Sequence, residues 1–219
     1  FYIQHPKGSL LWGTGLNDSY IKIKGGRSFY GGLSNHIVKK TLQKKLNEIG
    51  VSLQNISYVS VSHLHPDHTG NLHLFKKSKI LLQKEEVDAG FGPFPFFYFF
   101  EFEHYKSIKD QIQVLNGDYD LFGDGMVTII KAPGHTPGHQ VLLVRLPNKG
   151  SIILGGDLYH SKENQMKKVK PFIITYNKEE LQKSFSKVEM IQKKENAFLW
   201  IQHEPSHWDQ ALKPPLYYD

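Results

Sequence analysis

Cysteine is absent from the 219-residue chain. Without thiols, the protein can form neither a disulfide framework nor a thiolate metal site, and a cysteine nucleophile is excluded. Any bound metal must therefore be held by nitrogen and oxygen ligands. The same absence fits a bacterial cytoplasmic protein and a periplasmic one equally well.

Long apolar runs, internal repeats and blocks of like charge are also lacking. No stretch is apolar for long enough to span a membrane. Apolar and polar residues are distributed similarly in both halves, which predicts one soluble globular domain over residues 1–219. We expect a short segment to precede Phe1, because the chain opens inside the strand-like run FYIQH without an initiator methionine.

The charge is unbalanced, with 27 basic against 21 acidic residues and a net charge of +6. The lysines are scattered through helix-like stretches such as KKTLQKKLNE, where they alternate with apolar residues and glutamates. Because no aromatic-basic stacking motif or lysine cluster accompanies them, we expect solvated helix faces, with no nucleic-acid and no membrane partner.

Strand-like and helix-like periodicities are mixed along the whole chain. Helical spacing predicts helices over 35–49 and 178–194, with Ser34 or Asn35 capping the first, and a short helix over KEEVDAG. Strands are predicted in FYIQH and GSLLW, in NISYVSVS, in KILLQ, in GMVTIIK, in QVLLVRL and SIIL, and in AFLWIQH. Hairpins among these strands favour two mixed β-sheets flanked by helices, in the α/β class, over a doubly wound sheet.

Metal-ligating side chains follow several of these strands. The stretch VSHLHPDHTG offers His63, His65, Asp67 and His68 directly after a strand, and three later strand ends offer His135 and His139, Asp157, and His203. Imidazole and carboxylate groups suit Zn²⁺, and their number exceeds the needs of one ion. The residues therefore predict a two-metal centre at the rim of a sheet, where loops meet.

The motifs HLHPDHTG, PGHTPGH and GGD, followed by a late strand-end histidine, resemble the metallo-β-lactamase superfamily. The resemblance implies an αββα sandwich with two Zn²⁺ per chain. It further implies that His63, His65 and His135 hold the first ion, that Asp67, His68 and His203 hold the second, and that Asp157 bridges both. In this pattern His139 is a supporting residue.

Several branches of the superfamily fit less well. His65 stands where di-iron members usually carry glutamate, and the bridging Asp157 is usually missing from true zinc β-lactamases. The segments HPKGSLLWGTG, GGDLYHSKENQ and LWIQHEPSHWDQALKPPLYYD resemble the dinuclear N-acyl-homoserine lactonases, in particular AidC-type members. The resemblance implies a quorum-quenching ester hydrolase that opens a lactone ring with a hydroxide bridged between two zinc ions.

The chain departs from the lactonase pattern at two positions. Gly13 replaces a common aspartate, so any support from that carboxylate is missing, and His160 replaces a tyrosine that hydrogen-bonds the substrate, with Tyr159 one position earlier. We expect His160 to donate that hydrogen bond, with an ordinary loop histidine as the alternative. Asp67 is expected to transfer the proton.

An acyl chain needs an apolar groove, and the segment FGPFPFFYFFEFEHY, residues 91 to 105, provides the best candidate. Phe94, Phe96 and Phe97 are its predicted substrate contacts, together with Tyr159 and His160. The alternative is that these aromatic residues fill the core or a dimer interface, so a homodimer is also considered.

Two other enzymatic functions and one non-enzymatic function share the motif. A glyoxalase II-type thioester hydrolase has the same ligand pattern, although the expected basic cluster for glutathione is not evident, and a phosphotriesterase-like hydrolase would use the same ions. A metal-dependent binding module is disfavoured, because degenerate members would lose ligands and all seven positions here carry suitable groups.

Overall fold

A computed structural model describes residues 1–29, 34–93, 101–168 and 175–219 of the chain. The chain divides into two compact units. Unit 1 comprises Phe1–Leu81 and Gly90–Gln113, and unit 2 comprises Leu82–Ala89 and Val114–Asp219. The single domain over residues 1–219 stays a prediction.

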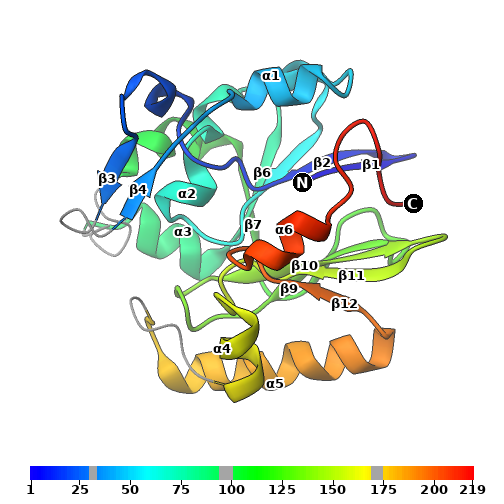
Figure 1. Cartoon of the computed structure of the whole chain (residues 1–219). Coiled ribbons are helices and arrows are strands. Elements are labelled where there is room, and N and C mark those ends of the chain that lie inside the picture. The colour runs from blue at the N-terminus through cyan, green and yellow to red at the C-terminus, as the bar shows by residue number, and fades with distance from the viewer. Residues whose placement is uncertain (30–33, 94–100, 169–174) are drawn as a thin grey trace. The chain divides into compact units, whose positions relative to one another are not determined.

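Most of a five-stranded mixed sheet lies in unit 1, with the strand order β1-β2-β5-β6-β7 (Figure 1). Strands β1 and β2 form an antiparallel hairpin, whereas β2, β5 and β6 run parallel. Apolar side chains such as Leu10, Val59 and Ile80 are fully buried, which explains why these short runs form central strands. The strands are β1 (Tyr2–His5), β2 (Gly8–Trp12), β5 (Tyr58–Ser60), β6 (Lys79–Gln83) and β7 (Ile112–Leu115).

The helix predicted over 35–49 is shorter than expected, and this prediction was wrong at its start. Residues Ser34–His36 form strand β4, which pairs with β3 (Arg27–Phe29), and helix α1 spans Leu42–Asn47. The hydroxyl of Thr41 caps α1 by accepting a hydrogen bond from the Lys44 N–H. A cap at Thr41 therefore overrides the helical spacing that Ile37 and Val38 share with the apolar residues of α1.

Short helices connect the strands of unit 1. The α-helix α2 (Pro66–Thr69) follows β5, and the remaining segments are 3-10 helices. These are η1 (Asp18–Lys22), η3 (Leu53–Asn55), η4 (Leu72–Leu74), η6 (Glu101–His104) and η7 (Lys106–Gln111).

Unit 2 contains a second mixed sheet, with the strand order β12-β11-β10-β9-β8. The predicted hairpin of β10 and β11 is present, and β12 lies parallel to β11 at the edge. The strands are β8 (Tyr119–Asp120), β9 (Val127–Lys131), β10 (Gln140–Leu146), β11 (Gly150–Leu154) and β12 (Phe198–Trp200). The helices of this part are α3 (Lys84–Gly90, whose last residue belongs to unit 1), α4 (Lys162–Lys167), α5 (Lys178–Glu195) and α6 (Pro205–Gln210).

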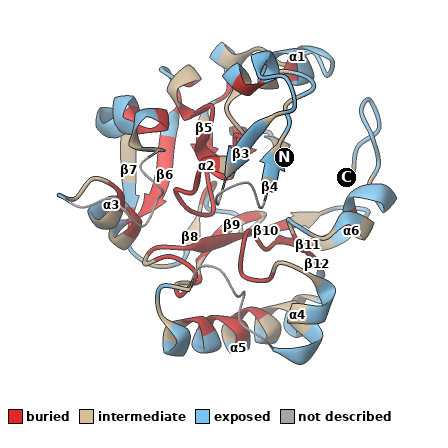
Figure 2. Cartoon of the chain, turned by 60° about the vertical axis from the view of Figure 1, so that its left-hand side comes forward, coloured by how far each residue is buried: buried red, intermediate tan, exposed pale blue. Residues whose placement is uncertain are grey.

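Helix α5 covers one face of this sheet. Figure 2 shows its buried side turned toward the strands, and Leu181, Phe185 and Val188 are 0% exposed within the core cluster of unit 2. Burying each such side chain contributes about 1.5–3 kcal/mol. Asn177 caps the helix by accepting from the Glu180 N–H, and Asn196 ends it with a φ of 47°. The predicted helix over 178–194 is therefore confirmed to within one residue.

None of the helices within the described ranges combines the length and the apolar character that are required to cross a membrane.

Candidate functional site

The first cluster comprises His63, His65, Asp67 and His68, and it lies at the end of β5 in unit 1. Pro66 occupies the first turn of α2, and the resulting helical turn brings Asp67 and His68 together. The Nε2 atom of His63 lies 2.7 Å from Nδ1 of His65, and Nε2 of His68 lies 3.4 Å from the Asp67 carboxylate. The predicted ligands of this motif therefore converge within one loop.

Ser62 contacts two imidazole rings of the first cluster. Its hydroxyl oxygen lies 2.9 Å from Nδ1 of His63 and 3.2 Å from Nδ1 of His68. When both Nδ1 atoms carry protons and donate to this oxygen, both Nε2 atoms present a lone pair. A metal ion binds such a lone pair, so this arrangement of hydrogen bonds gives the ligating form of both rings.

A backbone segment next to β2 supports the same loop. The N–H and the hydroxyl of Thr14 both donate to the carbonyl oxygen of His68, and the Gly70 N–H donates to Gly15. A Cβ atom on Gly70 would lie 2.1 Å from the backbone nitrogen of Asn17, so the close approach requires glycine. Although Gly13 carries no carboxylate, its neighbours still fix the loop through the backbone.

The second cluster comprises His135, Asp157, His160 and His203, all in unit 2. His135 follows β9, Asp157 and His160 follow β11, and His203 follows β12. The Asp157 carboxylate is buried, and its oxygens lie 3.5 Å from Nε2 of His135, 3.4 Å from Nε2 of His160 and 3.2 Å from Nε2 of His203. The predicted bridging carboxylate is thus the centre of the second cluster.

His139 holds the backbone of Asp157 in place. Its Nδ1 lies 3.0 Å from the carbonyl oxygen of Ala132, which can only accept, so Nδ1 carries the proton. Its Nε2 then accepts a hydrogen bond from the Asp157 N–H at 3.1 Å. This position agrees with the supporting role that was predicted for His139.

Glu86 is a functional residue that the sequence analysis missed. It is fully buried in α3, and one carboxylate oxygen accepts from the Thr136 hydroxyl at 2.7 Å and from the Gly138 N–H at 2.9 Å. A Cβ atom on Gly138 would lie 2.3 Å from the Glu86 nitrogen. The carboxylate therefore anchors the loop that carries His135, and nothing in the run KEEV distinguishes Glu86 from Glu85.

Tyr159 lies in the core of unit 2 rather than among the substrate contacts. It is 1% exposed, its ring stacks on Phe185 at 4.5 Å, and its hydroxyl donates to Glu189. Burial, together with the Glu189 carboxylate, raises the pKa of Tyr159 well above its ordinary value. This position corrects the prediction that Tyr159 binds substrate.

His160 is the more accessible of these two neighbours. Its side chain is 36% exposed, and its ring stacks on that of His203 with a centroid separation of 5.2 Å. The segments that follow His160 and His203 are joined by a hydrogen bond, which the Lys162 N–H donates to the Glu204 carboxylate at 3.0 Å.

The predicted acyl contacts Phe94, Phe96 and Phe97 lie outside the described residues. The flanking part of the aromatic segment is described, and there Phe91, Phe102 and Tyr105 pack edge to face with centroids 5.4–5.8 Å apart. Tyr105 is 0% exposed. These three residues show the packing that was expected if the segment contributes to the core.

The donor set of both clusters fits zinc. It contains only imidazole nitrogens and carboxylate oxygens, and the distances of 3.2–3.5 Å around Asp157 match those between ligands of a shared ion better than direct hydrogen bonds. His63 and His65 also turn nitrogen atoms toward each other at 2.7 Å. Each unit therefore presents preformed ligands for a divalent metal.

The family model of the metallo-beta-lactamase superfamily matches residues 1–199. A curated relative, the N-acyl homoserine lactonase AttM of Azorhizobium caulinodans, is 28% identical over 233 residues, covering 100% of this chain and 86% of that protein. AttM of Rhizobium radiobacter is 31% identical over 182 residues, covering 80% of this chain and 68% of that protein.

Two solved structures show the likeness in three dimensions. An N-acyl homoserine lactone hydrolase with the product N-hexanoyl-L-homoserine at its catalytic metal centre has a TM-score of 0.82 and 24% identity, over 100% of this chain and 85% of that chain. The dizinc quorum-quenching lactonase AidC, in complex with the same product, has a TM-score of 0.69 and 20% identity, over 98% and 75%. These likenesses confirm the predicted fold class and the resemblance that the motifs indicated.

Proposed function

Because the chain belongs to the metallo-β-lactamase superfamily, we propose that it hydrolyses the ester bond of N-acyl-homoserine lactones and thereby inactivates these quorum-sensing signals. The observation that carries this proposal is the buried Asp157 carboxylate, which is surrounded by three imidazole nitrogens within 3.5 Å. A carboxylate in that position can bridge two ions, and two curated relatives are named N-acyl homoserine lactonases.

Two zinc ions per chain are the metals of this proposal. His63, His65 and His135 would hold the first ion, and Asp67, His68 and His203 would hold the second. Asp157 would contribute its carboxylate to both. The contacts of Ser62 are compatible with this assignment, because Nε2 of His63 and His68 is available when the hydroxyl accepts from both Nδ1 atoms.

The bound ions would supply a nucleophilic hydroxide near neutral pH and polarise the ester carbonyl. The protein residues supply the proton transfer and the orientation. The side chain of Asp67 is 26% exposed, so its carboxylate can accept the proton of the attacking water and deliver it to the ring oxygen as the C–O bond breaks. The products are one carboxylate and one alcohol on the same opened chain.

His160 is the substrate-orienting residue of this proposal. Its side chain is 36% exposed, and its Nε2 lies 3.4 Å from the Asp157 carboxylate, where a lactone carbonyl that approaches the ions would also lie. An N–H at this position donates to the carbonyl oxygen, on which negative charge develops in the transition state. The acyl chain is assigned to Phe94, Phe96 and Phe97, and a homodimer stays a prediction.

The test is ring opening by the purified, zinc-loaded protein. N-butanoyl- and N-dodecanoyl-homoserine lactones are compared with S-lactoylglutathione and a phosphotriester. Hydrolysis of the lactones is monitored by the acid that is released. We expect rapid turnover of at least one lactone and slower turnover of the other two classes. A metallated protein that leaves both lactones intact while it cleaves the thioester would replace the proposal with a glyoxalase II-type activity.

A further inference from the structure

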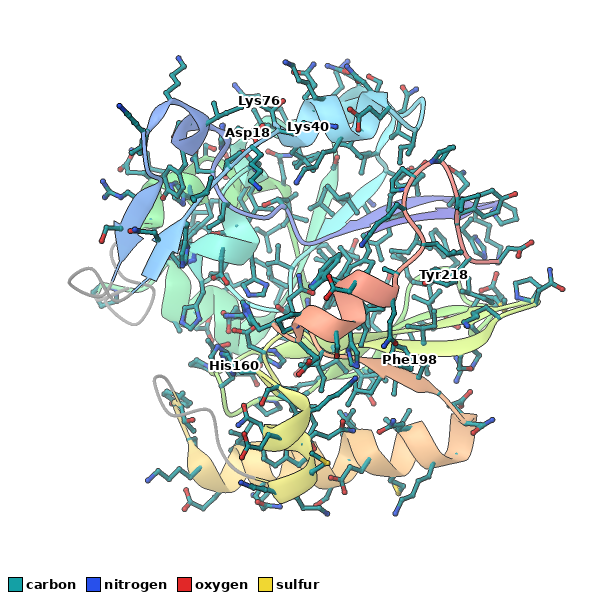
Figure 3. The ribbon with its side chains drawn as sticks, viewed as in Figure 1. Asp18, Lys40, Lys76, His160, Phe198 and Tyr218 are labelled. Carbon is teal, nitrogen blue, oxygen red and sulfur yellow. The ribbon has the colours of Figure 1, made fainter. Side chains whose placement is uncertain are left out.

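Three donor groups of unit 2 lie around one point. Asp157, His160 and His203 each offer a ligand atom, and these atoms lie within 4.8 Å of one another. Figure 3 labels His160 immediately before α4. Its Nε2 lies 3.4 Å from one oxygen of Asp157, and Nε2 of His203 lies 3.2 Å from the other.

These distances suit ligands of one ion. Zinc bonds of about 2.0–2.2 Å in tetrahedral geometry place two ligand atoms roughly 3.3–3.6 Å apart. A direct hydrogen bond from an imidazolium to a carboxylate would be shorter, about 2.7–2.9 Å. The spacing of His160 from Asp157 therefore resembles that of His203, which is already assigned as a ligand.

The tautomer of His160 is not fixed by its surroundings, in contrast to that of His139. Nδ1 of His160 is buried and has no hydrogen-bond partner among the described residues. The ring can therefore carry its proton on Nδ1, which leaves a lone pair on Nε2, or on Nε2, which makes that atom a donor. One nitrogen can thus bind a metal in one state and a carbonyl oxygen in the other.

The surrounding contacts hold the two imidazoles in parallel. The rings of His160 and His203 are inclined by only 9°. Glu204, next to His203, accepts from the Lys162 N–H, and the Lys162 ammonium lies 2.8 Å from the Ser206 hydroxyl. Both rings are therefore presented to Asp157 from segments that are joined to each other.

We propose that His160 is a metal ligand in the substrate-free protein, that its Nε2 binds an ion at the Asp157 carboxylate, and that the substrate displaces it. The proposal rests on the proposed function for the identity of the substrate, but the coordination itself requires only the metal. Displacement would break one coordination bond, Nε2 would take up a proton while Nδ1 releases its own, and the Nε2 N–H would form one hydrogen bond to the carbonyl oxygen. Substrate binding then competes with an internal ligand.

Cobalt titration of the metal-free protein tests the coordination directly. His160→Phe keeps an aromatic ring that can stack on His203 but removes both nitrogens, whereas His5→Phe removes an imidazole from β1 that belongs to neither cluster. We expect His160→Phe to lower the affinity for one of two cobalt ions by roughly tenfold or more and to shift the visible d–d bands. Wild-type affinity and an unchanged spectrum would overturn the proposal.

A second variant covers the case in which His160→Phe fails to fold, as judged by thermal unfolding of the metal-free form. His160→Gln keeps a polar side chain and a hydrogen-bond donor, but an amide is a far weaker ligand than imidazole. We expect the same loss of cobalt affinity, together with a lower KM for a lactone and a smaller change in kcat, because no ligand has to be displaced. A KM that is unchanged or raised, with wild-type cobalt affinity, would contradict the exchange.

The two proposals can fail separately. If the wild-type protein hydrolyses no lactone while His160→Phe loses cobalt affinity, the ligand role of His160 stands and the proposed function falls. If the wild-type protein hydrolyses lactones while both variants bind cobalt normally, the proposed function stands and His160 acts only as a hydrogen-bond donor.

Discussion

The two clusters of metal-ligating residues are built in different ways. The first cluster comes from six consecutive positions, His63 to His68, and one hydroxyl, that of Ser62, contacts two of its imidazoles. The second cluster comes from three strand ends that are far apart in the sequence. Its support comes from buried groups on other elements, chiefly Glu86 on α3 and His139 before β10.

This difference predicts which substitutions should impair metal binding or folding in each cluster. In the first cluster, the geometry follows from one loop and one helical turn, so a change in Ser62 should alter metal binding with little effect on folding. In the second cluster, the ligand loop is anchored through buried polar contacts, so loss of an anchor should affect stability and metal binding together. Four substitutions test this comparison.

The largest effect is expected from Asp157→Asn. The amide keeps the size of the side chain but removes the negative charge that three imidazoles surround, and it cannot bridge two ions through charged oxygens. We expect lactone hydrolysis to fall by at least about 10³-fold and zinc content to fall toward one ion per chain. Initial rates and elemental analysis measure both quantities.

Asp118→Asn is the matched control for this substitution, because Asp118 forms an ion pair with Lys187 on the surface of the same unit. It should retain wild-type zinc content and rate. An Asp157→Asn protein that binds two zinc ions and remains active would show that the second cluster is not organised around this carboxylate.

Glu86→Leu should have the second-largest effect. The substitution leaves the Thr136 hydroxyl and the Gly138 N–H buried without their acceptor, which costs about 1–3 kcal/mol for each group. We expect the free energy of unfolding of the metal-free protein to fall by about 2–4 kcal/mol, with weaker zinc binding in addition. Urea unfolding and competition with a chelator measure the two effects.

The neighbouring glutamate provides the comparison. Glu85 is partly exposed and pairs with Lys131, so Glu85→Leu should change stability by less than about 1 kcal/mol. Equal losses in the two variants would show that the buried carboxylate of Glu86 does not anchor the loop.

Ser62→Ala should weaken metal binding without a comparable loss of stability. The change removes the hydroxyl that can accept from Nδ1 of His63 and His68, so the tautomers that leave Nε2 free for a metal lose this hydrogen bond. We expect zinc affinity to fall roughly tenfold, with a change in unfolding free energy of about 1 kcal/mol. Ser60→Ala, which removes another buried hydroxyl that donates to Leu81, should cost similar stability but leave zinc affinity unchanged.

The contrast between the clusters also explains what the sequence could predict. The seven residues predicted as ligands were singled out because each follows an apolar strand-like run, and the order of motifs indicated the family. The helix from Lys178 was predicted because Leu181, Phe185 and Val188 have helical spacing and Asn177 caps it. Local patterns of this kind are sufficient when the determining contacts lie within a few residues.

Other features depended on contacts between distant residues. Glu86 has an acidic neighbour of the same type, and only the tertiary structure shows which carboxylate is buried against Thr136. Tyr159 was misassigned because the sequence shows a tyrosine beside the expected position but not that its ring stacks on Phe185. The start of α1 was misplaced because the apolar spacing is compatible with a helix that begins at either position 35 or position 42, and the cap at Thr41 selects the later start.

His207→Asn should give the smallest effect, and only in the pH dependence of stability. His207 is buried beside β12, and its Nδ1 accepts a hydrogen bond from the Ile201 N–H at 3.0 Å. Burial, together with the nearby Lys162 ammonium, lowers the pKa of His207 below its ordinary value of 6.5. As the pH falls, the unfolded chain therefore binds this proton before the folded protein does, so the free energy of unfolding decreases with decreasing pH below about 6.5.

The amide oxygen of asparagine can replace Nδ1 as acceptor but does not titrate. We therefore expect the metal-free wild-type protein to lose more stability than His207→Asn between about pH 7.5 and pH 5.5, although the histidines of both clusters titrate in each protein. Urea midpoints across this range measure the difference, with a chelator present. Parallel pH profiles would show that His207 takes up its proton equally well in the folded and unfolded states.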